Sequence, residues 1–132
     1  DESPVIRKWS VIAAPASGEV PGDDAQWRVA YSKVSGDLPD SDLPIGRRVL
    51  AKGYLNVQVA GSIQLDINDI AGLRVWIDGI EMTNPSESIH LAKGRRALTF
   101  LIDRQKRARN GLRVEPLAEP GSPVKFQPEG GS

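Results

Sequence analysis

A period of two in the apolar residues in the middle of the chain is the feature that most limits its fold. It runs through residues 55–59, 63–67 and 73–77, with an apolar residue at every second position. A period of two places those side chains on one face of a β-strand. Such a face becomes stable only by packing against another layer. The sequence therefore predicts neighbouring strands with one buried face each, the first two separated by a turn at residues 60–62.

Turn residues agree with this prediction. Asp78 and Gly79 separate two apolar residues and form a strong two-residue hairpin signal. Glycine accepts the positive φ angle that a type I′ turn requires. A second turn is expected at residues 93–94, where it would pair a strand over residues 88–92 with one over 97–103.

Helix-forming stretches are short, and the remaining apolar segments also have strand character. Short strands about ten residues apart are typical of sandwiches and jelly rolls. We expect an all-β fold, a single antiparallel β-sandwich resembling a jelly roll, over residues 1–118. Residues 119–132 are rich in proline and glycine and are expected to form a tail or linker. The further expected strands are residues 9–14, 26–31, 88–92, 97–103 and 112–117.

The composition excludes several functions. Lys plus Arg and Asp plus Glu number 17 each, so no net charge attracts nucleic acid or an anionic membrane. No apolar run reaches the length of about 18 residues that a bilayer span needs, so no membrane insertion is expected. The chain has no cysteine, which removes disulfides, a thiolate nucleophile, cysteine-bound zinc and covalent haem attachment.

Catalytic machinery is not evident in the sequence. The sole histidine, His90, lies in an expected strand, and the nearby Ser86 and Ser88 do not lie on a nucleophile elbow. The acids are scattered over loops instead of forming an evident pair in a cleft. We therefore expect that the chain is not an enzyme.

An outward tryptophan is the main candidate for a contact site. If the apolar positions of residues 73–77 face the core, Trp76 faces outward beside Arg74 and Asp78, and Tyr54 faces outward on its own strand. An exposed indole can stack on a sugar ring or anchor a protein interface. Alternatively, a loop covers Trp76 and Arg74 packs on its ring.

Two polar clusters are secondary candidates. Asp66, Asn68 and Asp69 offer the oxygen ligands that calcium prefers, although turns favour the same residues.

A basic patch is also expected, at a hairpin tip or a single helical turn that could dock an acidic partner. Single-strand nucleic-acid binding would need aromatic residues between the cations, and they are absent there, so nucleic acid is not favoured. The patch consists of Arg104, Lys106, Arg107 and Arg109.

The order of these motifs resembles a known family of modules. Residues 53–57, 60–65 and 72–79 read Gly-Tyr-Leu-Asn-Val, Ala-Gly-Ser-Ile-Gln-Leu and Gly-Leu-Arg-Val-Trp-Ile-Asp-Gly. They resemble the centre of protective-antigen-type β-sandwich modules, which are attached to glycosidases, adhesins and toxins. Residues 9–15 and 112–115, Trp-Ser-Val-Ile-Ala-Ala-Pro and Leu-Arg-Val-Glu, resemble the β-module of exported planctomycete-type proteins that also carry a dehydrogenase-like propeller and a c-type haem segment.

The resemblance implies a function outside catalysis. It implies an accessory module of a larger exported bacterial protein, periplasmic or secreted, that docks neighbouring domains or a glycan. A carbohydrate-binding module and a scaffold for a haem-c or dehydrogenase assembly are the alternatives. No cofactor is expected apart from the calcium considered above.

Overall fold

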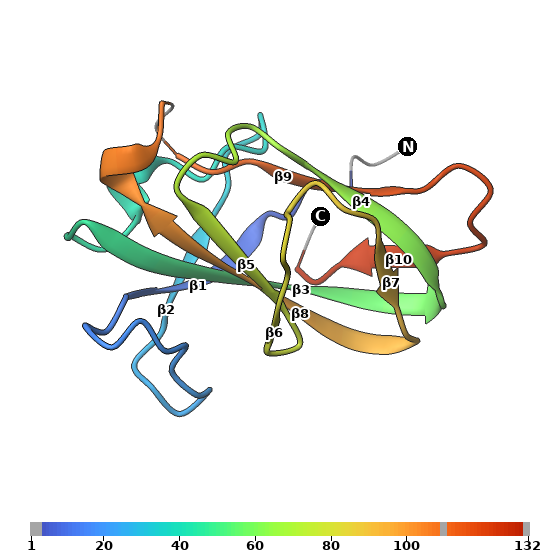
Figure 1. Cartoon of the computed structure of the whole chain (residues 1–132), viewed down its shortest axis with the longest axis horizontal. Coiled ribbons are helices and arrows are strands. Elements are labelled where there is room, and N and C mark those ends of the chain that lie inside the picture. Colours follow the sequence, from blue (N-terminus) through green and yellow to red (C-terminus); the bar gives the residue numbers. More distant parts are fainter. Residues whose placement is uncertain (1–3, 109–110, 131–132) are drawn as a thin grey trace.

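Two antiparallel β-sheets pack face to face in the computed structural model, which describes residues 4–108 and 111–130 (Figure 1). The predicted all-β antiparallel sandwich is therefore confirmed. The large sheet has the order β2-β1-β3-β8-β5-β6, with β10 also pairing with β3, and the small sheet has the order β7-β4-β9.

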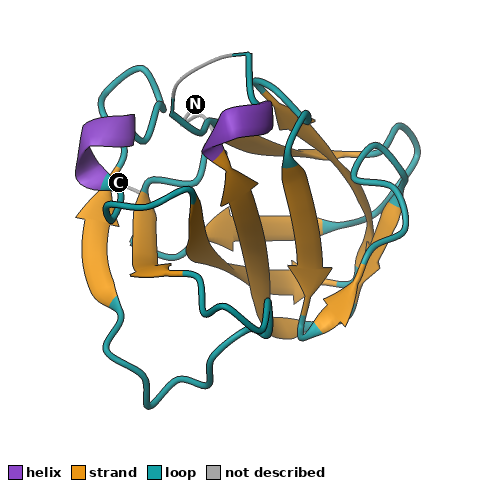
Figure 2. Ribbon diagram, turned by 60° about the vertical axis from the view of Figure 1, so that its left-hand side comes forward, coloured by secondary structure: helices purple, strands orange, loops and turns teal. Residues whose placement is uncertain are grey.

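Most strands overlap the expected segments, but β3 begins well before the expected alternation at residue 55, and β10 was not expected. The large sheet contains β1 (Lys8–Ala13), β2 (Arg28–Tyr31), β3 (Arg48–Val59), β5 (Leu73–Ile77), β6 (Ile80–Glu81), β8 (Gly94–Asp103) and β10 (Lys125–Pro128). The small sheet contains β4 (Gly61–Ile67), β7 (Ile89–Leu91) and β9 (Val114–Ala118). Two short 3-10 turns, η1 (Asp40–Asp42) and η2 (Arg104–Lys106), lie at the same end of the sandwich (Figure 2).

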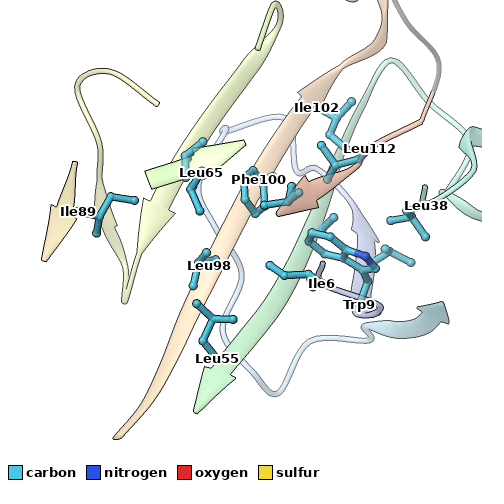
Figure 3. Packing of buried hydrophobic residues seen from close by; sticks show 14 of the residues in the cluster. Ile6, Trp9, Leu38, Leu55, Leu65, Ile89, Leu98, Phe100, Ile102 and Leu112 are labelled. Atoms are coloured by element: carbon cyan, nitrogen blue, oxygen red, sulfur yellow. The ribbon is translucent and has the colours of Figure 1, made fainter. Parts of the chain in front are cut away.

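The core lies between the two sheets. Inward side chains of β3, β8 and β5 meet those of β4, β7 and β9 in one continuous apolar cluster. Phe100 packs edge-on against Trp9, with ring centroids 5.7 Å apart, and both lie in the middle of this cluster (Figure 3). Burial of this apolar surface is the main force that holds the sheets together.

The Asp78-Gly79 turn is confirmed. It joins β5 to β6, and its two residues have φ angles of 50° and 83°. Positive φ at both central residues matches the type I′ turn expected from the sequence. Asp78 holds this conformation with its own side chain, because its carboxylate accepts a hydrogen bond from the backbone N–H of Ala97 at 2.9 Å.

Two expected pairings are wrong. β3 and β4 do not form a hairpin, because the chain passes from the large sheet to the small sheet after Ala60. Gly61 allows this crossing, since a Cβ there would lie 2.8 Å from the backbone nitrogen of Val124. Likewise β7 pairs with β4, while β8 pairs with β3 and β5, so the turn at residues 93–94 joins two sheets.

The carboxyl-terminal segment differs from the expected tail. Residues 125–128 form β10, which pairs with one end of β3, and Val124 just before it is buried. Phe126 packs against the main core. The apolar side chains at these two positions supply the packing that proline and glycine alone would not.

No helix among residues 4–108 and 111–130 has both the length and the hydropathy that a membrane span requires.

Candidate functional site

A long loop covers part of the outer face of the large sheet. Residues 14–27, called the strap below, leave β1 and return to β2 (blue, at the lower left of Figure 1). The strap contributes Val20 and Trp27 to a second apolar cluster, whose buried members are Leu50, Leu101 and Trp76 from the sheet. The indole N–H of Trp27 donates to the carbonyl of Gly22 at 2.9 Å and so closes the strap on itself.

Trp76 lies on the outer face, as the alternation predicts, but it is covered. Only 8% of its surface is exposed, because the strap lies over the ring. The guanidinium carbon of Arg74 is 4.9 Å from the ring centroid, within the range of a cation–π contact. The expectation of a solvent-exposed indole is therefore wrong, and the arrangement is the alternative in which a loop covers Trp76 and Arg74 packs on it.

A hollow of about 600 Å³ lies between the strap and the Asp78-Gly79 hairpin, and we call it the outer groove. It brings together Arg74, Trp76 and Asp78, three of the four predicted contact residues. Trp76 forms part of its wall. Its other polar lining comes from Glu19 and Asp23 of the strap and from Lys52 and Thr99 of the sheet.

Lys52 anchors the strap, and the sequence did not single it out. Its side chain is largely buried, and its ammonium group lies 3.0 Å from Asp23 Oδ1 and 4.3 Å from the Trp27 ring centroid. The hydrogen bond and positive charge of Lys52 lower the pKa of Asp23 below its ordinary value. Nothing in the residues around Lys52 distinguishes it from a solvated lysine, because its partners come from a distant loop.

Arg74 and Asp78 of the outer groove are also paired. Arg74 forms two hydrogen bonds to Glu81, at 2.8 and 2.7 Å, and these bonds lower the pKa of Glu81 and raise that of Arg74. Asp78 forms an ion pair with Arg96 at 3.1 Å. Both pairs are partly exposed, so they orient the side chains more than they stabilise the fold.

Tyr54 lies in a different, smaller hollow. It shares this hollow with Lys8, Val29 and Arg95, among others. Arg95 stacks on its ring, with the guanidinium carbon 3.6 Å from the ring centroid, and is held there by two hydrogen bonds to Glu129. Trp27, Tyr54 and Trp76 thus each carry a cation on their rings.

Two of the four residues of the expected basic patch are used inside the fold. Arg104 lies 2.9 Å from Asp40 and donates to the carbonyls of Pro44 and Gly46. Arg107 donates to the carbonyls of Asp69 at 2.6 Å and Gly111 at 3.0 Å, and burial lowers its pKa. These two cations hold loops in place.

Lys106 is exposed beside them and lines a hollow near Gly72 and Asp103. Arg109 lies outside the described residues.

The candidate calcium ligands are engaged by N–H donors. Asn68 Oδ1 accepts from the backbone N–H of Arg113 at 3.1 Å, and Asp69 accepts from those of Ala71 at 3.0 Å and Ala108 at 2.8 Å. Asp66 is exposed on β4. Over the described ranges, no three His, Asp or Glu side chains are grouped to hold a metal ion.

His90 is exposed on β7, where it lies opposite Ser62 of β4. Ser88, the nearest serine in the sequence, donates its hydroxyl to Glu119 at 2.7 Å.

Comparisons of the sequence with models of protein families and with curated proteins find no match.

Proposed function

We propose that this chain is a non-catalytic accessory module of a larger exported bacterial protein, and that its outer groove contacts a neighbouring domain. The observation that carries this proposal is the gathering of Lys52, Arg74, Asp23 and Asp78 beside Trp76 in one hollow. Protein interfaces commonly carry a rim of polar and charged groups, which fixes the register and the choice of partner. An extracytoplasmic location belongs to the same proposal.

A protein surface fits the outer groove better than a sugar does. Stacking on a sugar needs a free aromatic face, and the ring of Trp76 is covered by the strap and by Arg74. A groove that carries charges of both signs selects a partner with the opposite arrangement. The neighbouring domain is therefore expected to present acidic and basic groups in complementary positions.

A glycan is the second candidate, because a hollow with an indole edge, a hydroxyl and carboxylates has the general character of a small-ligand site. In that case Arg74 would have to leave the ring as the sugar binds. The third candidate, a scaffold for a haem-c assembly, would place the haem on another domain, since this chain has no cysteine.

Nuclear magnetic resonance of the isotope-labelled chain tests the proposal. Titration with the domains that adjoin it in the longer protein should shift amide signals of residues 18–23 and 74–79. Exchanging both Glu19 and Arg74 for alanine should weaken binding at least tenfold while hardly changing the melting temperature, because both side chains are exposed. The Lys125→Ala variant, on the exposed side of β10, is the matched control.

Two results would contradict docking through the outer groove. One is a set of shifts confined to other surfaces. The other is selective binding of an oligosaccharide on a glycan array, tested with and without calcium, that shifts the amide signals of residues 18–23 and 74–79. That second result would establish the glycan candidate instead.

A further inference from the structure

β2 ends the large sheet with an open edge. In the part of the chain that the structure describes, β1 is the only strand that pairs with it. Ser32 donates its backbone N–H to the carbonyl of Arg7 at 2.7 Å, which makes Arg7 and Ser32 a hydrogen-bonded pair of the ladder. Hydrogen-bonded and non-hydrogen-bonded pairs alternate in an antiparallel ladder. Val29 and Tyr31 therefore point their backbone N–H and C=O groups away from β1, toward the open side.

The side chains along this edge are unusually apolar for an unpaired strand. Val29 is 51% exposed and Tyr31 is 59% exposed, and Val34 shortly after them is 95% exposed. Natural edge strands are commonly blocked by proline, a bulge or a charge that points inward. β2 has neither proline nor a register shift in its pairing with β1, and the one charge on the face of the buried Ala30 is Arg28, which is exposed at the start of the strand. It presents an exposed apolar flank instead.

Cations surround the same edge. Arg28 is exposed at the start of β2, and Lys33 is exposed just after its end. Lys8 is the first residue of the adjoining β1, and Arg7 directly precedes it. The ion pairs formed among the described residues all use other cations. Lys8 lies near enough to Glu129 to help lower its pKa, after the larger effect of Arg95. A chain that is neutral overall is thus locally basic here.

We propose that the open edge of β2 binds an extended acidic segment of a partner protein, which adds to the large sheet as a further strand. The backbone groups of Val29 and Tyr31 would pair with the segment, and their side chains would contact its apolar residues. Arg28 and Lys33 would contact its carboxylates. This mode of recognition takes its affinity from main-chain hydrogen bonds and its specificity from alternate side chains.

A second copy of this chain is a poorer occupant. Pairing of β2 with β2 would bring two sets of these cations together, which costs energy through like-charge repulsion. The proposed binding site on β2 contains none of the residues that line the outer groove, so binding there does not require the outer groove.

The probe is a synthetic eight-residue peptide of alternating valine and glutamate with blocked ends. Titration of the isotope-labelled chain should shift the amide signals of residues 28–34 and slow hydrogen exchange at Val29 and Tyr31. A peptide of alternating valine and lysine should fail to bind. Shifts confined to other residues, or equal binding of both peptides, would overturn the proposal.

Two variants separate backbone pairing from charge. Val29→Pro removes an N–H that faces the open side and leaves the β1 ladder intact, so it should weaken binding at least tenfold. Val29→Thr keeps the N–H and the size of the side chain, and should bind nearly as the original chain does. If Val29→Pro binds as tightly as Val29→Thr, strand addition is refuted.

Charge reversal provides a test that remains valid if the proline variant does not fold. Exchanging Arg28 and Lys33 for glutamate should abolish binding, while the same exchange at the exposed Lys93 and Lys106 should leave it unchanged. Sedimentation of the chain alone should show a monomer. A dimer formed through residues 28–34 would contradict the proposal, because it would show that a second copy of the chain occupies the edge. The Glu19 and Arg74 variants should still bind the peptide, so failure of the outer groove and failure of this edge are distinguishable.

Discussion

Replacing Trp76 with alanine measures what the contact between strap and sheet contributes to stability. An indole buries about 200 Å², and at about 25 cal/mol per Å² this area corresponds to about 5 kcal/mol. The compact denatured chain already buries some of this area, and the strap can settle partly into the space left behind. We therefore expect a loss of about 3 kcal/mol, at the lower end of the range for aromatic-to-alanine substitutions in cores.

Urea unfolding followed by circular dichroism measures this loss without depending on tryptophan fluorescence. For a chain of this size the melting temperature should fall by about 10 °C. Cleavage at Glu19 by a glutamate-specific protease should become faster, because the strap loses its main apolar contact with the sheet. Trp76→Phe should lose less stability than Trp76→Ala, and its cleavage at Glu19 should be slower.

A loss below about 1 kcal/mol, which is typical of surface substitutions and not of buried aromatic residues, would refute this reasoning. It would mean that the ring is not packed beneath the strap. Trp76 would then return to the role of a solvent-facing platform, and the glycan candidate would gain support.

Two further predictions concern the cations and carboxylates at the end of the sandwich. The hydrogen bond from Arg47 is the largest cause of the lowered pKa of Asp103. The ionised Asp103 should therefore stabilise the folded chain fully above pH 3.8, the pKa of an ordinary aspartate. This stabilisation should be lost as the pH falls through the lower pKa that Asp103 has in the folded chain. The urea concentration at the unfolding midpoint should therefore decrease between pH 7 and pH 2. In the Asp103→Asn variant this decrease should be smaller. Arg104→Met should lower stability by about 2 kcal/mol, because charge-assisted hydrogen bonds to the loop at residues 40–46 are lost. Lys106→Met, its exposed neighbour, should have no measurable effect on thermal unfolding.

Much of the fold could be predicted because strand position is encoded locally. Alternation and turn residues located the second half of β3, β4 and β5, and the positive φ angles of the Asp78-Gly79 turn. Sheet membership could not be predicted in the same way. Alternation predicts that one face of a strand is buried, but it does not predict which strands are its hydrogen-bonded neighbours in the sheet. The insertion of β8 between β3 and β5 depends on contacts between distant parts of the chain.

The candidate site was predicted only in part, for a related reason. The alternation of β5 correctly placed Trp76 on the outer face, but its burial depends on a strap composed mainly of small, polar and turn-forming residues. Lys52 was missed because lysine at an outward strand position normally indicates a solvated face. Its burial depends on Asp23 and Trp27, which the chain brings to it from another loop.

The sequence does contain one signal that separates covered from open parts of the outer face. Residues 49–51, 75–77 and 100–102 are continuously apolar, and a strand of this kind is usually covered on both faces. These are the positions near the strap, where Leu50, Trp76 and Leu101 are buried. Alternation with polar residues returns along residues 54–58, so this half of the outer face remains accessible. Contact surfaces should therefore be sought at the border of the strap and along the alternating half of the sheet, where the outer groove and the β2 edge lie.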